Sequence, residues 1–148
     1  MREVVDPLPL LDEHRTRLDA PADAAWNALV SFLRGRIGGS GAFARLLGCD
    51  PVAASPSFTG AVDQTLPGFR VVESEPGHLL ALRGRHRFAR YALTFLIEDG
   101  ELRARSEAAF PGIRGWLYRG LLMWTGGHRL VTRGMIRRVA RDARRAPA

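Results

Sequence analysis

Four polar side chains in the second half of the sequence have the types that proton transfer and ligand orientation require: His86, Arg103, Arg105 and Glu107. A histidine donates or accepts a proton near neutral pH, and a charged group inside a protein must be paired or hydrogen-bonded. An Arg–Glu pair within a cavity would therefore orient a carbonyl group next to His86 as general acid/base. The candidate catalytic residues are thus His86, Arg105 and Glu107.

Whether these arginines belong to a catalytic site or are only solvent-exposed depends on which face of the sheet they occupy. Strand alternation places Arg103, Arg105 and Glu107 on one face. If that face is the outer face of the sheet, the three charged side chains are solvated and the wall of the cavity is apolar. The inner face would then carry Leu102, Ala104, Ser106 and Ala108. We favour this second arrangement, so the sequence leaves open whether any reaction is catalysed and favours a protein that is not an enzyme.

A nucleotide site and a metal site are not expected. Residues 39–44 match G-x-G-x-x-A and Asp63 follows, but the match lies between two helical segments rather than after a strand. Cys49 stands at a helix end, where a small apolar filler is the commoner role. The histidines are too scattered for a zinc site: His14, His78, His86 and His128. We predict no metal and no cofactor.

Aromatic and apolar side chains suggest a binding wall instead. Tyrosine and tryptophan combine a large apolar body with a polar tip, which suits the wall of a small-molecule pocket. The candidate ligand-binding residues are Tyr91, Phe95, Trp116, Tyr118 and Leu121.

The net charge of +7 is concentrated near the C-terminus, where residues 112–148 hold 9 arginines and one acidic residue. Arg129, Arg133, Arg137 and Arg141 follow one helix face at i, i+4 spacing, while the adjacent stripe is apolar. This row could contact an anionic surface weakly and in a salt-sensitive way. Nucleic acid is not an expected partner, because no aromatic residues alternate with the arginines.

The surrounding pattern predicts one α+β domain in residues 1–148, with an irregular arm (1–11), a core (12–143) and a tail (144–148). A strand at 12–19 precedes helices at 24–33 and 42–47. Alternating segments separated by Pro/Gly turns then predict antiparallel neighbours. They lie at 58–66, 69–73, 78–88, 91–97 and 102–110. A long C-terminal helix follows, with a possible break at Gly126 and Gly127.

The compartment and the membrane can be addressed from the same sequence. A single cysteine excludes an intramolecular disulfide, and no secretory leader is evident, so we expect a cytoplasmic protein. The apolar stretch 116–124 is far shorter than the roughly 20 residues of a membrane span. We expect no membrane span.

The order of elements resembles the START-like (SRPBCC) superfamily of polyketide cyclase/dehydrase and lipid-transfer proteins. Two segments carry the resemblance: APADAAWNAL at 20–29, where Trp26 and Leu29 would pack the first helix on the sheet, and GFRVVESEPGHLLAL at 68–82, a hairpin closed by Pro76 and Gly77. The resemblance covers about residues 12–143. It implies a helix-grip fold, in which a curved antiparallel sheet of about six or seven strands wraps a long C-terminal helix.

The resemblance also implies a cavity between the sheet and that helix. Our leading hypothesis is that the cavity binds a hydrophobic or amphipathic small molecule, lipid or polyketide-like. The alternatives are an aromatase/cyclase or dehydratase acting on such a ligand, and an interaction protein that uses the basic helix. The oligomeric state stays open, a homodimer included.

Overall fold

The structure is a computed structural model, which describes residues 8–37, 39, 41–87, 89–110, 112, 116–117 and 127–145, with the backbone alone at 43 and 127–130. The elements in chain order are β1 (Leu10–Arg17), α1 (Ala22–Arg36), α2 (Gly41–Leu47), β2 (Thr65–Leu66), β3 (Phe69–Glu75), β4 (Leu79–Arg85), β5 (Arg90–Glu98), β6 (Glu101–Ala109) and α4 (Gly127–Arg145).

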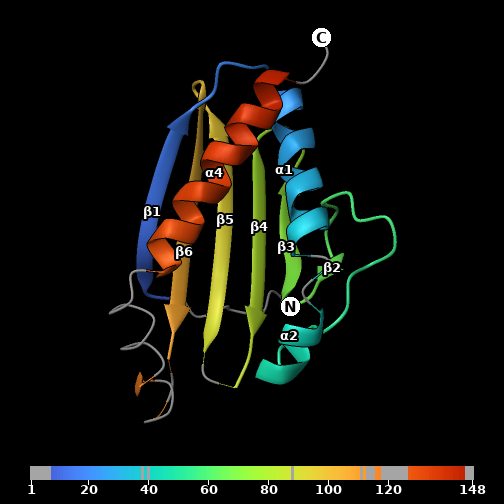
Figure 1. Cartoon of the computed structure of the whole chain (residues 1–148), viewed down its shortest axis with the longest axis vertical. Coiled ribbons are helices and arrows are strands. Elements are labelled where there is room, and N and C mark those ends of the chain that lie inside the picture. Colours follow the sequence, from blue (N-terminus) through green and yellow to red (C-terminus); the bar gives the residue numbers. More distant parts are fainter. Residues whose placement is uncertain are drawn as a thin grey trace, which may run out of the picture.

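The described strands form one antiparallel sheet of six strands in the order β1-β6-β5-β4-β3-β2. Strands β3 to β6 pair with their sequence neighbours, while β1 closes the sheet against β6. Helices α1 and α4 contact each other and lie over the same face of the curved sheet (Figure 1). This arrangement confirms the predicted helix-grip architecture.

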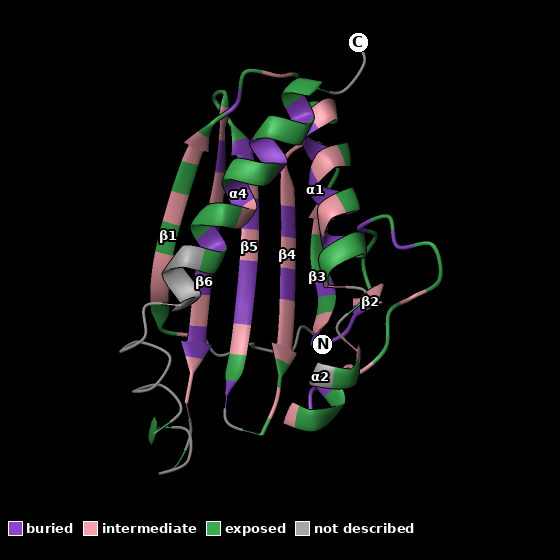
Figure 2. Ribbon diagram, viewed as in Figure 1, coloured by how far each residue is buried: buried purple, intermediate pink, exposed green. Residues whose placement is uncertain are grey.

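The core lies between that face of the sheet and the two helices. Helix α1 buries a stripe at helical spacing, in which Trp26 and Leu29 pack against the sheet as expected. The strands contribute large inward side chains such as Leu80, Phe95 and Leu102. Figure 2 shows buried residues on β4, β5 and β6 beneath the helices, with exposed residues on the outer surfaces of α1 and α4.

Strand β6 settles which way its charged residues point. Leu102, Ala104, Ser106 and Ala108 are buried, whereas the Arg105 side chain is 51% exposed and its Nε lies 3.0 Å from a Glu107 carboxylate oxygen. The apolar inner face and the solvated outer arginines are therefore confirmed. Strand β5 lies between β4 and β6, in agreement with the predicted pairing of consecutive strands.

The strand predicted at 58–66 is wrong over most of its length, since only Thr65 and Leu66 form β2. Gly60 and Asp63 have positive φ angles, and the side chain of Gln64 accepts hydrogen bonds from backbone N–H groups of residues 59–61. Phe58 is 1% exposed, so it anchors a loop in the core. The buried Phe58 side chain fixes a loop, and together with the polar residues around it this gives the alternation of apolar and polar residues that suggested a strand.

Helix α4 packs on a slightly different face from the predicted one. Its buried positions are Thr132, Ile136, Val139, Ala140 and Ala143. Val131, an apolar residue beside the arginine row in the sequence, is 66% exposed. The helix begins at Gly127, and residue 126 lies outside the described part. None of the described helices is both long and apolar enough to span a bilayer.

Candidate functional site

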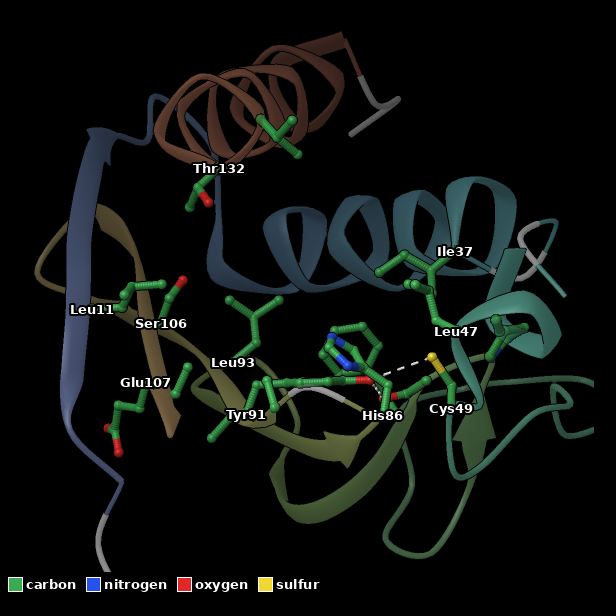
Figure 3. A pocket seen from close by; sticks show the side chains of 18 of the residues that line it. Leu11, Ile37, Leu47, Cys49, His86, Tyr91, Leu93, Ser106, Glu107 and Thr132 are labelled. Carbon is green, nitrogen blue, oxygen red and sulfur yellow. Dashed lines mark hydrogen bonds between the residues drawn. The ribbon is translucent and has the colours of Figure 1, made fainter. Parts of the chain in front are cut away.

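A cavity of about 370 Å³ lies between the sheet and the helices. This volume is at the lower end of the roughly 300–1,000 Å³ typical of small-molecule sites. Its walls come from β1, β5, β6, α2, α4, the C-terminal end of α1 and the turn before β3 (Figure 3). The lining is mainly apolar and includes Leu11, Ile37, Leu47, Leu93, Phe110 and Met135. The site therefore favours an apolar occupant.

Tyr91 closes one end of the cavity. Its hydroxyl donates a 2.7 Å hydrogen bond to the Gly68 carbonyl and lies 3.9 Å from the Cys49 sulfur. Its ring meets Phe69 edge to face, with the centroids 5.2 Å apart. A Cβ on Gly84 would collide with the Gly68 carbonyl, so glycine is required for this close backbone approach. The ring and the turn thus form one fixed wall.

His86 follows β4 and lies in the same end of the cavity. Its ring centroid is 5.4 Å from that of Tyr91, and its backbone N–H donates to the Ala89 carbonyl. Burial lowers the pKa of His86 below the ordinary 6.5, because desolvation disfavours the imidazolium. The ring is therefore neutral near pH 7 and can serve as a hydrogen-bonding group or a weak base.

Ser106 on β6 and Thr132 on α4 lie toward the other end of the cavity (Figure 3). Both residues line the cavity and both are nearly fully buried. The Ser106 hydroxyl is directed into the cavity in Figure 3. Its Oγ has no hydrogen-bond partner among the described residues.

The structure separates the predicted wall residues. Tyr91 lines the cavity, whereas Phe95 belongs to the core at 1% exposure and is outside the lining. Trp116 is 69% exposed. Tyr118 and Leu121 lie outside the described residues.

The predicted catalytic residues are likewise divided. His86 reaches the cavity, while Arg105 lies on the outer face of the sheet. Glu107 borders the cavity, but its carboxylate is directed away from the centre and pairs with Arg105 (Figure 3). The structure does not bring these three groups together around one reacting atom.

A partly buried Asp12–His14 pair was missing from the sequence analysis. Both side chains are on the inner face of β1, at 9% and 12% exposure, with Oδ2 and Nε2 3.3 Å apart. The signal was present, since residues two apart on a strand share a face. The burial of Cys49, at 8% exposure, fits its predicted role as an apolar filler. Its place in the cavity wall and the unpartnered Ser106 hydroxyl were missed, because both arise from contacts distant in sequence.

The basic row on α4 is solvent-exposed. Arg133, Arg137 and Arg141 are exposed, and the side chain of Arg129 is outside the described part. One neighbouring arginine, Arg138, reaches Asp142 at 3.9 Å. Within the described residues, no three His, Cys, Asp or Glu side chains gather in a way that could hold a metal ion.

Comparisons with known proteins bear on the fold. No protein-family model and no curated sequence matches the chain. Among solved structures, protein MLL2253 from Mesorhizobium loti has a TM-score of 0.55 at 12% identity, covering 93% of this chain and 98% of that one. A conserved protein from Geobacillus kaustophilus has a TM-score of 0.54 at 15% identity, covering 90% and 94%.

A third similar structure is the di-domain ARO/CYC BexL from the BE-7585A biosynthetic pathway. Its TM-score is 0.57 at 13% identity over 96% of this chain and 52% of BexL, so this chain spans about half of the di-domain protein. At such identities the likeness establishes a shared fold.

Proposed function

We propose that this chain is a START-like protein that binds a hydrophobic or amphipathic small molecule in the cavity under α4. The observation that supports this most is the cavity of about 370 Å³ with mainly apolar walls. Ligand sites in proteins are typically concave, mostly apolar pockets with a few polar groups. A pocket of this size and lining between a sheet and a helix has the form of a small-molecule site.

The proposed ligand class is lipid or polyketide-like. The apolar lining supports it, and so does the fold shared with BexL, whose name describes an aromatase/cyclase. Fold alone does not fix the ligand. The first experiment is therefore native mass spectrometry of the purified protein, followed by solvent extraction of any co-purifying molecule.

A probe titration tests binding directly. Diphenylhexatriene, an uncharged hydrocarbon fluorophore, should bind saturably with one molecule per chain. Ala108→Phe places a ring in the cavity and should weaken binding by at least about tenfold. Ala81→Phe is the matched control, because Ala81 alternates with the buried Leu80 and Leu82 and so lies on the outer face of β4. Absence of saturable binding to the wild type, or equal binding by Ala108→Phe, would refute the proposal.

A second candidate is a cyclase or dehydratase acting on a ligand in the same cavity. The observation in its favour is His86, a neutral imidazole at the cavity wall next to the Tyr91 ring. Arg105 on the outer face cannot orient a substrate carbonyl there. His86→Ala should abolish turnover of an extracted ligand while the protein stays folded. Full turnover by that variant would remove His86 from the mechanism.

A further inference from the structure

Ser106 is a cavity residue whose hydrogen-bonding capacity the fold leaves unused. It is 4% exposed, and its Oγ has no partner among the residues that the structure describes. The hydroxyl is directed from β6 into the cavity (Figure 3). A buried hydroxyl without a partner is unfavourable, and such groups normally meet a protein atom or a water molecule. A ligand atom that meets Ser106 Oγ removes this penalty.

Two other polar residues on this side of the sheet make contacts of their own. Across the sheet Ser106 is paired with Asp12 of β1 and Leu93 of β5. The Asp12 carboxylate contacts His14 Nε2 at 3.3 Å. At the opposite end of the cavity, the Tyr91 hydroxyl donates a hydrogen bond to the Gly68 carbonyl in the turn before β3. Ser106 is thus positioned to bond with a group that enters through the cavity itself.

The charges around the cavity disfavour an ionic ligand. Of the described lining residues, Glu107 carries a formal charge, and its carboxylate is 3.0 Å from Arg105 on the far side of the sheet. His86 is neutral near pH 7. A buried charge without a nearby counterion is strongly unfavourable. Among the described lining residues, neither a carboxylate nor an ammonium group would find an unpaired counterion.

We propose that the ligand is an uncharged molecule with an apolar body and one hydroxyl or carbonyl group, which hydrogen-bonds to Ser106 Oγ beneath α4. The inference rests on the binding function proposed above and adds the chemical class of the ligand. The apolar body extends past Leu93 toward Ile37 and Leu47 at the other end (Figure 3).

Displacement of diphenylhexatriene by matched chain molecules tests the inference. The competitors are dodecanol, dodecanoate and dodecylammonium, which differ in the head group alone. In the wild type at about pH 8, dodecanol should compete at least about tenfold more strongly than either ion. Ser106→Ala should weaken the binding of dodecanol about tenfold and leave the affinity for the hydrocarbon probe unchanged. Thr94→Val removes a hydroxyl from the outer face of β5 and should change neither the affinity for dodecanol nor that for the probe.

Two results would overturn the inference. One is equal dodecanol affinity in the wild type and Ser106→Ala while both bind the probe; the other is an ion that competes as well as dodecanol. Failure of both proteins to bind the probe would instead refute the binding function itself. A thermal melt confirms that Ser106→Ala is folded, and removal of an unpaired hydroxyl should not lower its melting temperature.

Discussion

The hydrogen bond from Tyr91 to the turn before β3 provides a quantitative test of how the cavity is closed. Tyr91→Phe removes the hydroxyl that donates to the Gly68 carbonyl at 2.7 Å and keeps the ring that packs on Phe69. A typical intramolecular hydrogen bond contributes about 1 kcal/mol, and a carbonyl left unpaired raises the loss toward about 2 kcal/mol. For a chain of this size each kcal/mol lowers the melting temperature by roughly 2–4 °C.

Urea unfolding followed by circular dichroism measures this loss. The midpoint should fall while the m-value stays constant, because the surface exposed on unfolding does not change. Thr59→Val serves as the control, since it removes an exposed hydroxyl contact to Gln64 at 3.3 Å and should cost less than about 0.5 kcal/mol. If Tyr91→Phe costs no more than that control, the hydroxyl does not hold the turn and our account of the wall fails.

Three further predictions concern the same fold. Gly84→Ala should destabilise the protein by about 3 kcal/mol or more, because its Cβ meets the Gly68 carbonyl; an unchanged thermal midpoint would contradict that close approach. His86 binds a proton less readily when folded, so its contribution to stability is full above pH 6.5 and lost as the pH falls below it. Between about pH 7 and pH 5 the wild type should therefore lose more stability in urea than His86→Asn, and parallel losses would refute this. Arg133→Glu/Arg137→Glu should weaken co-sedimentation with phosphatidylserine vesicles at low salt, whereas binding that persists in the variant or at high salt would exclude the basic helix face as the contact.

The parts of the fold that depend on local patterns could be predicted from the sequence. Strands β3 to β6 are joined by short turns, and the alternation in β6 correctly separated Ser106 from Arg105. The predicted strand around Phe58 failed because a loop anchored in the core leaves the same alternation as a strand.

The site was harder to predict than the fold, since its parts are far apart in the chain. Cys49, His86, Tyr91 and Ser106 meet in one cavity from an α2 end, a β4 end and two strands. Alternation placed Ser106 inside as part of an apolar wall. Whether its hydroxyl finds a partner depends on the side chains across the sheet, which no local pattern specifies.

The position of β1 has a consequence for the order in which the chain folds. Residue Leu10 is paired with Glu107, so the first strand finds its neighbour only after nearly the whole sheet has been synthesised. Loop closure over such a separation is slow, whereas the consecutive strands from β3 to β6 can pair through short turns. We therefore expect the sheet of β3 to β6 to assemble first and β1 to pair with β6 last. Pulsed hydrogen exchange during refolding should then protect the amide of Leu82 before that of His14.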